Sequence, residues 1–330
     1  MADRFVAGVD SGGAKTIALV ADMCGRIVGA SRLGDLDGRR PTLAQRMADV
    51  AALVRQAIAQ AGRDEEQAEA AVFGLTGADW PDDHEPRAAL LRAAGIARSV
   101  QVKNDMYVGL RAGTDRPYGV VIGAGSGVNA AAIAPDGREW AFGYYATAGG
   151  GNETAQEALH AALRADDGRA PRTPLTDLVL SKLSFASVEA MLRAYTAGQL
   201  SRRVLRSLCP LVFEAACAGD RAAVDILARQ GSVLAEYAAA LIHRFQMERL
   251  EFDVVLSGSM FKGRGPLLID TVAQAVHRVA PRARLLRPRF EPAVGGLLLA
   301  YDSLGVAVTP AMYDNLAHTS PAASFFDTAG

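Results

Sequence analysis

The first third of the chain combines two periods of hydrophobic and polar positions. Residues 5–10 form an apolar run that ends on an acid and predicts a buried strand, whereas residues 41–61 carry apolar side chains at helical spacing. The predicted order is strand, strand, strand, helix, strand, helix, strand, helix, over residues 5–10, 17–22, 27–30, 41–61, 70–75, 86–94, 99–102 and 105–113. Three hairpin-linked strands before the first helix indicate an α+β-like opening, unlike the strand–helix–strand opening of a dinucleotide-binding fold.

A similar opening begins again near residue 118, where two predicted strands flank a glycine-rich turn. The segments that follow predict a third strand, a mainly helical region, a strand, a helix, a short strand and a final helix, over residues 139–142, 153–244, 252–256, 267–279, 284–286 and 294–304. We expect a first lobe of residues 1–115 joined by the helix near 294–305, a second lobe of residues 116–293 and a weakly structured tail over residues 308–330. The glycine-rich turns of the two lobes are expected to face an interdomain cleft, a preferred place for small molecules.

Composition excludes several classes of protein. The chain has 330 residues, of which 50% are hydrophobic and 22% charged, so it carries enough apolar material for sizeable cores. Its 35 basic and 36 acidic side chains leave a net charge of −1, which gives no electrostatic footprint for nucleic acid or an anionic membrane. No apolar run approaches the ~20 residues of a membrane span, and no stretch resembles a signal peptide. We expect a cytoplasmic protein with neither a nucleic-acid nor a membrane partner.

The cysteines form no recognisable motif, whereas the glycines are in excess and clustered. The three cysteines (Cys24, Cys209 and Cys217) form no C-x-x-C motif and no disulfide framework, and the five histidines are scattered. Glycine is in excess, with 33 residues. Much of this excess lies in five short segments, residues 12–13, 123–127, 149–151, 258–263 and 295–296.

The first glycine-rich turn, with the sequence DSGGAKT over residues 10–16, is a candidate phosphate site. Glycines let backbone amides approach an anion closely. Asp10 ends the preceding strand, where a carboxylate suits a Mg²⁺ ion that bridges phosphates, usually through water. A plain hairpin turn has the same composition and is the alternative.

The second turn, GAGSG over residues 123–127, also suits phosphate. A strand follows it, so it lacks the helix that a dinucleotide fingerprint requires, and the alternative is again a simple hairpin. Two later glycine segments, residues 256–263 and 295–296, either admit a ligand or allow close packing.

Asp105 stands where a strand ends and a helix begins. It is a candidate general base for phosphoryl transfer to an alcohol, because a carboxylate can accept the hydroxyl proton. Judged locally, the role of helix N-cap is favoured. Residues 76–79 end another strand and offer hydrogen-bonding groups for a polyhydroxylated ligand.

The whole chain resembles the sugar kinases of the actin/hexokinase/Hsp70-like superfamily. More narrowly, it is similar to the N-acetylglucosamine kinase branch of the BadF/BadG/BcrA/BcrD ATPase family. The resemblance covers residues 8–305 and is carried by GVDSGGAKT (8–16), GLTGAD (74–79), NDMYVGLRAG (104–113), VVIGAGSGVNAAAIAPDG (120–137), DDGRAPRTPLTDLVL (166–180), VVLSGSMFKG (254–263) and AVGGLLLA (293–300).

This resemblance implies a two-lobed actin-like ATPase (ribonuclease H-like) fold of the α/β class, with a mixed sheet and flanking helices in each lobe, and ATP-dependent phosphorylation of an amino-sugar hydroxyl. It implies Asp105 as catalytic base and Asp10 as the residue that holds Mg²⁺ through water. The implied nucleotide contacts are Asp10, Gly12, Gly13, Thr16, Gly125, Ser126, Gly127, Gly258, Ser259, Lys262, Gly295 and Gly296. The implied sugar contacts are Gly77, Asp79, Asn104, Asp105, Gly150 and Asn152. A homodimer is also implied.

Two segments depart from the kinase pattern. Residues 149–154 read GGGNET where the kinases carry an acidic sugar-binding stretch, so Asn152 or Glu153 is the candidate substitute for the missing Asp. Residues 34–38 read GDLDG where an Asn is usual. Two further interpretations stay open: an ATPase activator of a reductase or dehydratase, which would hold an iron–sulfur cluster through cysteines, and a sugar- or nucleotide-binding relative without turnover.

Overall fold

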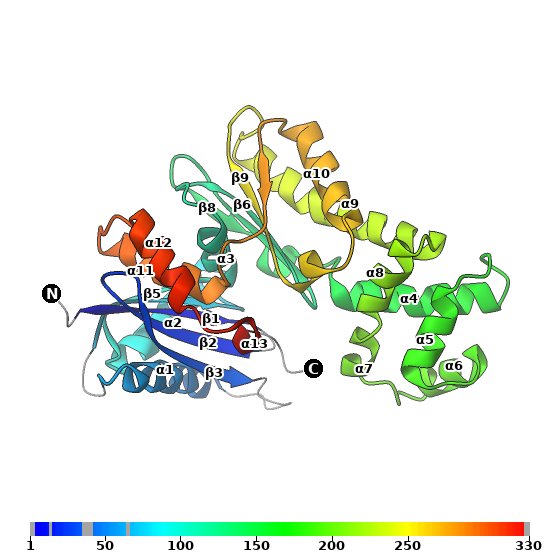
Figure 1. The fold of residues 1–330 in the computed structure, drawn as a ribbon, viewed down its shortest axis with the longest axis horizontal. Coiled ribbons are helices and arrows are strands. Elements are labelled where there is room, and N and C mark those ends of the chain that lie inside the picture. The colour runs from blue at the N-terminus through cyan, green and yellow to red at the C-terminus, as the bar shows by residue number, and fades with distance from the viewer. Residues whose placement is uncertain (1–3, 13–14, 35–41, 64–66, 327–330) are drawn as a thin grey trace. The chain divides into compact units, whose positions relative to one another are not determined.

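The computed structural model describes residues 4–12, 15–34, 42–63 and 67–326 (Figure 1). The chain divides into two compact units, one made of Met1–Val121 with Leu286–Gly330 and the other of Ile122–Leu285. Two five-stranded sheets with flanking helices account for the described strands. The expected α/β class with two lobes is confirmed. None of the helices in these described ranges combines the length and hydropathy that a membrane span needs.

The sheet of the first unit has the strand order β3-β2-β1-β4-β5. Its strands are β1 (Phe5–Ser11), β2 (Lys15–Asp22), β3 (Ile27–Gly34), β4 (Ala68–Leu75) and β5 (Ala97–Asn104). The first three pair antiparallel, whereas β1, β4 and β5 are parallel neighbours. The carboxyl ends of these three parallel strands therefore meet at one edge of the sheet.

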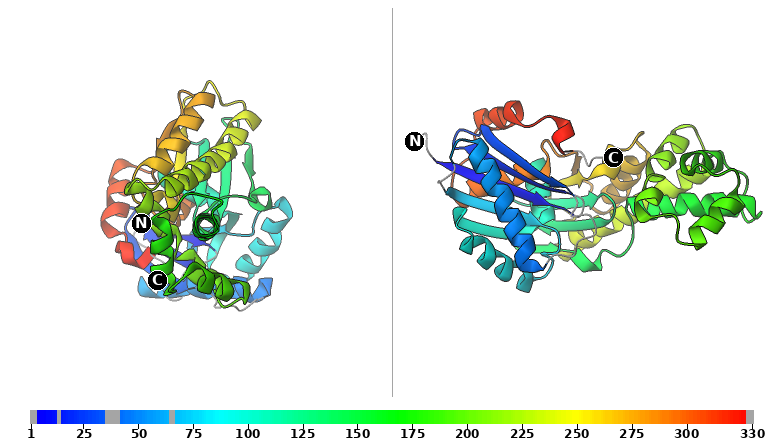
Figure 2. Two further views of the ribbon diagram at one scale, coloured as in Figure 1. Left: turned by 90° about the vertical axis from the view of Figure 1, so that its right-hand side faces the viewer. Right: turned by 90° about the horizontal axis from the view of Figure 1, so that it is seen from below.

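Successive side chains of β1 bury on opposite faces of this sheet, as the pleat requires. Phe5 and Val9 pack with helices α1 (Leu43–Gln60) and α2 (Pro81–Ala93), and Figure 2 shows α1 lying across that face. Val6 packs on the other face with α3 (Asp105–Gly113) and α11 (Pro292–Ser303). A Cβ added to Gly8 would lie 2.3 Å from the Leu297 nitrogen, so β1 and α11 are in backbone contact.

The expectation of a weakly structured tail is wrong for residues 310–326. Helices α12 (Pro310–Thr319) and α13 (Ala323–Phe326) form there, and the side chain of Met312 is buried in the same core as α11. Distant contacts order this segment: the Ile27 amide donates to the Thr319 hydroxyl at 2.8 Å, and Asn315 Nδ2 donates to the Cys24 carbonyl at 2.8 Å. The tail was mispredicted because these contacts join residues far apart in the sequence, which a local sequence pattern does not contain.

The second unit contains a sheet of order β10-β9-β6-β7-β8. Its strands are β6 (Gly119–Ala124, which begins in the first unit), β7 (Val128–Ile133), β8 (Glu139–Ala141), β9 (Asp253–Ser257) and β10 (Arg284–Leu286). Its helices are α4 (Gly151–Asp166), α5 (Leu175–Leu183), α6 (Val188–Thr196), α7 (Arg202–Arg206), α8 (Cys209–Cys217), α9 (Arg221–Arg244) and α10 (Leu267–Val279), with short 3₁₀ turns η1 (Gly143–Tyr145) and η2 (Ser259–Lys262). The expected helical region between β8 and β9 is confirmed.

Candidate active site

Polar residues gather at the sheet edge where β1, β4 and β5 end. The pairing register sets Asp10 opposite Gly74 and Leu75 opposite Asn104. Thr76 therefore follows β4 at the level where Asp105 begins α3 directly after β5. Parallel strands place these side chains, which are distant in sequence, at one edge.

The Asp105 carboxylate has two unequal oxygens. Thr76 Oγ1 donates a hydrogen bond of 2.8 Å to Oδ2, whereas Oδ1 is buried and has no hydrogen-bond partner in the described ranges. The helix N-cap is Asn104, whose Oδ1 accepts from the Met106 amide at 3.0 Å. The locally favoured N-cap role of Asp105 is therefore wrong: its neighbour caps α3, and the Asp105 carboxylate stays available.

Burial shifts the protonation of both carboxyl groups at this edge. It raises the pKa of Asp105 to about 6; the charge of Asp79 acts in the same direction and the Thr76 hydrogen bond acts against it. Burial also raises the pKa of Asp10 to about 7, helped by the charge of Asp105 and opposed by that of Lys15. Both carboxyl groups therefore change protonation near neutral pH, where a general base is effective.

The loop after β4 holds its polar groups in a network. Gly77 has φ +78°, and its carbonyl accepts from Arg87 Nη2 at 2.6 Å. Asn104 Nδ2 donates to Asp79 Oδ1 at 2.6 Å, and burial raises the pKa of Asp79. The structure thus brings together the predicted sugar contacts Gly77, Asp79 and Asn104 beside Asp105. Thr76 belongs to the predicted polar segment 76–79, but its contact with Asp105 was not predicted, because no local pattern ties its hydroxyl to a carboxylate 29 positions away.

The first glycine-rich turn joins β1 to β2. The Gly12 amide donates to the Lys15 carbonyl at 3.0 Å, and the Ser11 and Thr16 hydroxyls lie 2.9 Å apart in a buried hydrogen bond. The predicted contact Gly13 lies outside the described residues, as do residues 35–38 of the second departing segment.

The second turn joins β6 to β7 and packs on the start of α4. The Gly151 amide donates to the Gly125 carbonyl at 2.8 Å, and the Asn152 amide donates to the Ser126 carbonyl at 2.9 Å. Ser126 and Gly127 are exposed. A Cβ added at Gly125 or Gly127 would meet no atom of the described chain within 4 Å, so packing does not require glycine at either position.

Packing does require glycine at other predicted nucleotide contacts. A Cβ at Gly258, whose φ is +104°, would lie 2.4 Å from the Ala124 carbonyl oxygen. This close approach puts residues 258–262, with Ser259 and Lys262 exposed, beside the second turn. In the first unit, a Cβ at Gly295 would lie 1.9 Å from the Val108 carbonyl oxygen, and a Cβ at Gly296 would lie 3.0 Å from Gly8 Cα. The contact of α11 with α3 and β1 thus explains the glycines at 295 and 296 without a ligand.

The departing segment 149–154 is built into the same turn. A Cβ at Gly150 (φ +95°) would lie 2.7 Å from the Gly127 carbonyl carbon. Glu153 accepts from the Gly149 amide at 2.7 Å and from Gln230 Nε2 at 3.1 Å, so its carboxylate supports the loop. Asn152 Oδ1 accepts from Arg206 Nε at 3.1 Å. Of the two candidate substitutes for the missing Asp, Asn152 is exposed. The Glu153 carboxylate is instead engaged in hydrogen bonds that hold the loop.

The side chains that could ligate a metal are scattered over the described part of the structure. Across the ranges that the structure describes, no three His, Cys, Asp or Glu side chains are grouped to hold an ion. Cys24 and Cys217 are exposed and Cys209 is buried, and burial raises the pKa of the Cys209 thiol to about 11. A thiol that resists ionisation is poorly suited to ligate iron, because thiolates are the ligands of iron–sulfur clusters.

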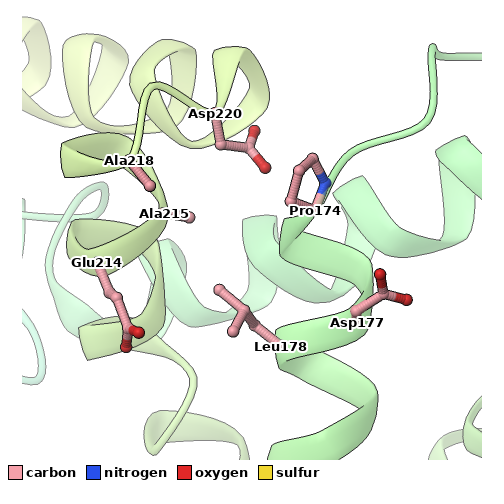
Figure 3. A pocket seen from close by; sticks show the side chains of 7 residues that line it. All are labelled: Pro174, Asp177, Leu178, Glu214, Ala215, Ala218 and Asp220. Carbon is pink, nitrogen blue, oxygen red and sulfur yellow. The ribbon is translucent and has the colours of Figure 1, made fainter.

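The second unit contains a cavity of about 390 Å³, and none of the predicted site residues that the structure describes lines it (Figure 3). It is lined by Pro174, Asp177, Leu178, Glu214, Ala215, Ala218 and Asp220. Asp220 caps α9 by accepting from the amides of Ala222 and Ala223, and it also accepts from the Leu175 amide. This carboxylate therefore joins α5 to α9 and has a structural role.

Comparisons with known proteins agree with this architecture. The chain is 25% identical over 319 residues to an N-acetyl-D-glucosamine kinase of Dictyostelium discoideum, covering 92% of this chain and 99% of the relative. It is 21% identical over 301 residues to an N-acetylmuramic acid/N-acetylglucosamine kinase of Clostridium acetobutylicum, covering 90% and 98%.

Solved structures show the same fold. A Chromobacterium violaceum protein, whose proposed activity is that of an N-acetylglucosamine kinase, matches with a TM-score of 0.68 and 25% identity over 90% of this chain and 99% of its own. A ROK family glucokinase of Streptomyces griseus, solved with glucose and AMPPNP, matches with a TM-score of 0.56 and 19% identity over 90% and 98%. The model of the BadF/BadG/BcrA/BcrD ATPase family matches residues 7–300. The chain belongs to the BadF/BadG/BcrA/BcrD ATPase family.

Proposed function

We propose that this chain is an ATP-dependent kinase that phosphorylates a hydroxyl of an amino sugar such as N-acetylglucosamine or glucosamine. The observation that carries the proposal is the Asp105 carboxylate, which has one oxygen held by Thr76 and the other without a partner in the described chain. A carboxylate in this state can accept the proton of an attacking hydroxyl. The amino-sugar kinases of Dictyostelium and Clostridium, which align with nearly the whole chain, support the substrate class.

Each unit, taken by itself, has its own proposed nucleotide contacts. Gly12, Gly13 and Thr16 in the first turn and Gly125, Ser126 and Gly127 in the second are proposed to bind the phosphates. The open space at Gly125 and Gly127 supports this assignment, because an oxyanion can approach their backbone closely. Gly258, Ser259 and Lys262 are proposed to lie around the adenosine, whereas the packing of α11 on α3 and β1 already accounts for the predicted contacts Gly295 and Gly296.

Mg²⁺ is assigned to Asp10, through water. The donor chemistry fits, because a carboxylate oxygen suits this hard cation. The repulsion between Asp10 and Asp105 also supports a cation here, because a positive charge would offset it. When bound, the ion would neutralise charge that develops on the transferring phosphoryl group.

In the first unit, the proposed sugar contacts are Asn104, Asp79 and Gly77 beside Asp105. In the second unit, Gly150 and Asn152 are proposed as sugar contacts. Asp105 Oδ1 takes the hydroxyl proton as the sugar oxygen forms its bond to the γ-phosphorus, and the bond from that phosphorus to the bridging oxygen of ADP breaks. The chain is further proposed to act in the cytoplasm, as its sequence pattern predicts, and to form a homodimer, as the family resemblance implies. Light scattering tests the mass of the assembly.

Asp105→Asn tests the base. The amide cannot accept the proton, so kcat should fall by about 10²–10⁴-fold, while the Kd for ATP stays within about twofold of the wild-type value. The matched control is Asp49→Asn, which changes an exposed carboxylate on α1 and should leave both constants unchanged. An Asp105→Asn variant that keeps most of its activity overturns the assignment.

A further inference from the structure

The unequal oxygens of Asp105 point to a role for Thr76. The Thr76 hydroxyl donates to Oδ2 at 2.8 Å and leaves Oδ1 as the oxygen without a partner in the described ranges. A hydroxyl carries one proton. While Asp105 is ionised, that proton is committed to the carboxylate.

Thr76 is itself held in place by β1. Its amide donates to the Ser11 carbonyl at 2.9 Å, which continues the parallel pairing of β1 and β4 by one residue. Its carbonyl is within 3.5 Å of Arg46 Nη2. The strand that carries Asp10 thus also fixes the donor that orients Asp105.

We propose that Thr76 is a positioning residue that holds Asp105 Oδ2, so that Oδ1 alone faces the acceptor hydroxyl and receives its proton. This inference rests on the proposed kinase function. The charged neighbours are Asp10, Asp79 and Arg46 around Asp105, with Glu291 and Lys15 beyond them acting on Asp10. A substitution at Thr76 leaves the identity of these charged residues unchanged, so it removes the hydrogen-bond donor alone.

The test compares Thr76→Val with Thr76→Ser, alone and combined with Asp105→Asn. Valine keeps the branched shape and removes the donor, so kcat should fall about 10–100-fold with little change in KM for ATP, as expected for the loss of a hydrogen bond to a charged group. Serine restores the donor and should recover most of the rate. In the Asp105→Asn background, Thr76→Val should cost less than about twofold, because Thr76 acts through that carboxylate.

Three controls separate the outcomes. Thr196→Val removes a hydroxyl that, among the described residues, donates to the Leu192 and Arg193 carbonyls of its own helix, and it should leave kcat unchanged. Melting temperatures show whether each variant is folded, and crystal structures of the wild type and Thr76→Val should show a rotated Asp105 carboxylate in the variant. The proposal for Thr76 is overturned if Thr76→Val changes neither kcat nor the orientation of the Asp105 carboxylate. It is also overturned if Thr76→Ser and Thr76→Val lower kcat equally. Either result leaves the proposed kinase function standing. A wild-type protein without sugar-dependent ADP release overturns the kinase function and the role of Thr76 with it.

Discussion

Gly127→Ala tests whether the second turn serves a ligand or only the fold. The backbone at Gly127 is not in the left-handed region, and an added Cβ would meet no atom of the described chain within 4 Å. The methyl group therefore has room in the protein itself. Under the proposed function, it occupies space that a phosphate oxygen needs beside the turn amides.

The structure sets the expected magnitudes. Alanine for glycine at a compatible position stabilises by about 0.4–1 kcal/mol, so the melting temperature of a chain of 330 residues should rise by about 0.6–1.4 °C. Loss of one amide hydrogen bond to a charged phosphate costs about 1.5–3 kcal/mol, which weakens nucleotide binding about 10–150-fold. The stability and the affinity are thus expected to change in opposite directions.

Gly258→Ala is the matched contrast. Its Cβ would lie 2.4 Å from the Ala124 carbonyl oxygen at φ +104°. Backbone strain of about 1–2 kcal/mol and overpacking of about 1–3 kcal/mol should together destabilise the protein by about 2–5 kcal/mol.

Thermal denaturation followed by circular dichroism measures stability, and calorimetric titration with a non-hydrolysable ATP analogue measures affinity. Gly127→Ala should retain its fold and lose affinity. If this variant binds the analogue as tightly as the wild type, the turn is an ordinary hairpin. If its melting temperature is as low as that of Gly258→Ala, glycine at position 127 is required for folding, and this result also refutes the reasoning.

Further predictions concern pH and stability. Because burial raises the pKa of Asp105 to about 6, kcat/KM for the sugar should fall as the pH is lowered through about 6 and the base becomes protonated; a profile flat to about pH 4 contradicts this. Burial and Asp105 raise the pKa of Asp10 from 3.8 to about 7, so the folded state binds protons more tightly and loses stability as the pH rises through this window. In magnesium-free buffer, Asp10→Asn should therefore melt above the wild type at about pH 8 and together with it at about pH 4, whereas equal melting at both pH values is the contrary result. Asp220→Ala removes the α9 N-cap and should destabilise by about 1–2 kcal/mol without weakening nucleotide binding; a large loss of affinity would place the nucleotide at the cavity of Figure 3.

Much of the strand and helix order follows from local patterns. The apolar runs of β1 and β4 and the helical spacing of α1 are visible in short windows, because strand and helix periods differ. The tail helices were missed for the opposite reason. Their order depends on contacts such as that of Thr319 with Ile27, which no window contains.

The sequence predicts which residues meet beside Asp105, but not which hydrogen bonds they make or which of them caps the helix. Asn104 and Asp105 are both good N-caps, and the one that caps depends on which residue leaves the strand conformation. Glycine composition likewise does not distinguish Gly127, which has open space above it, from Gly295, which touches another backbone. Only tertiary packing separates these two uses of glycine.

ADP release by the purified protein, measured with Mg²⁺-ATP in the presence and absence of N-acetylglucosamine, glucosamine and related amino sugars, tests the central claim most directly. The account predicts that release depends on one of these sugars, yields a sugar phosphate in equal amount, and is nearly abolished by Asp105→Asn. ADP release at the same rate without any sugar, or none with every amino sugar, would contradict it.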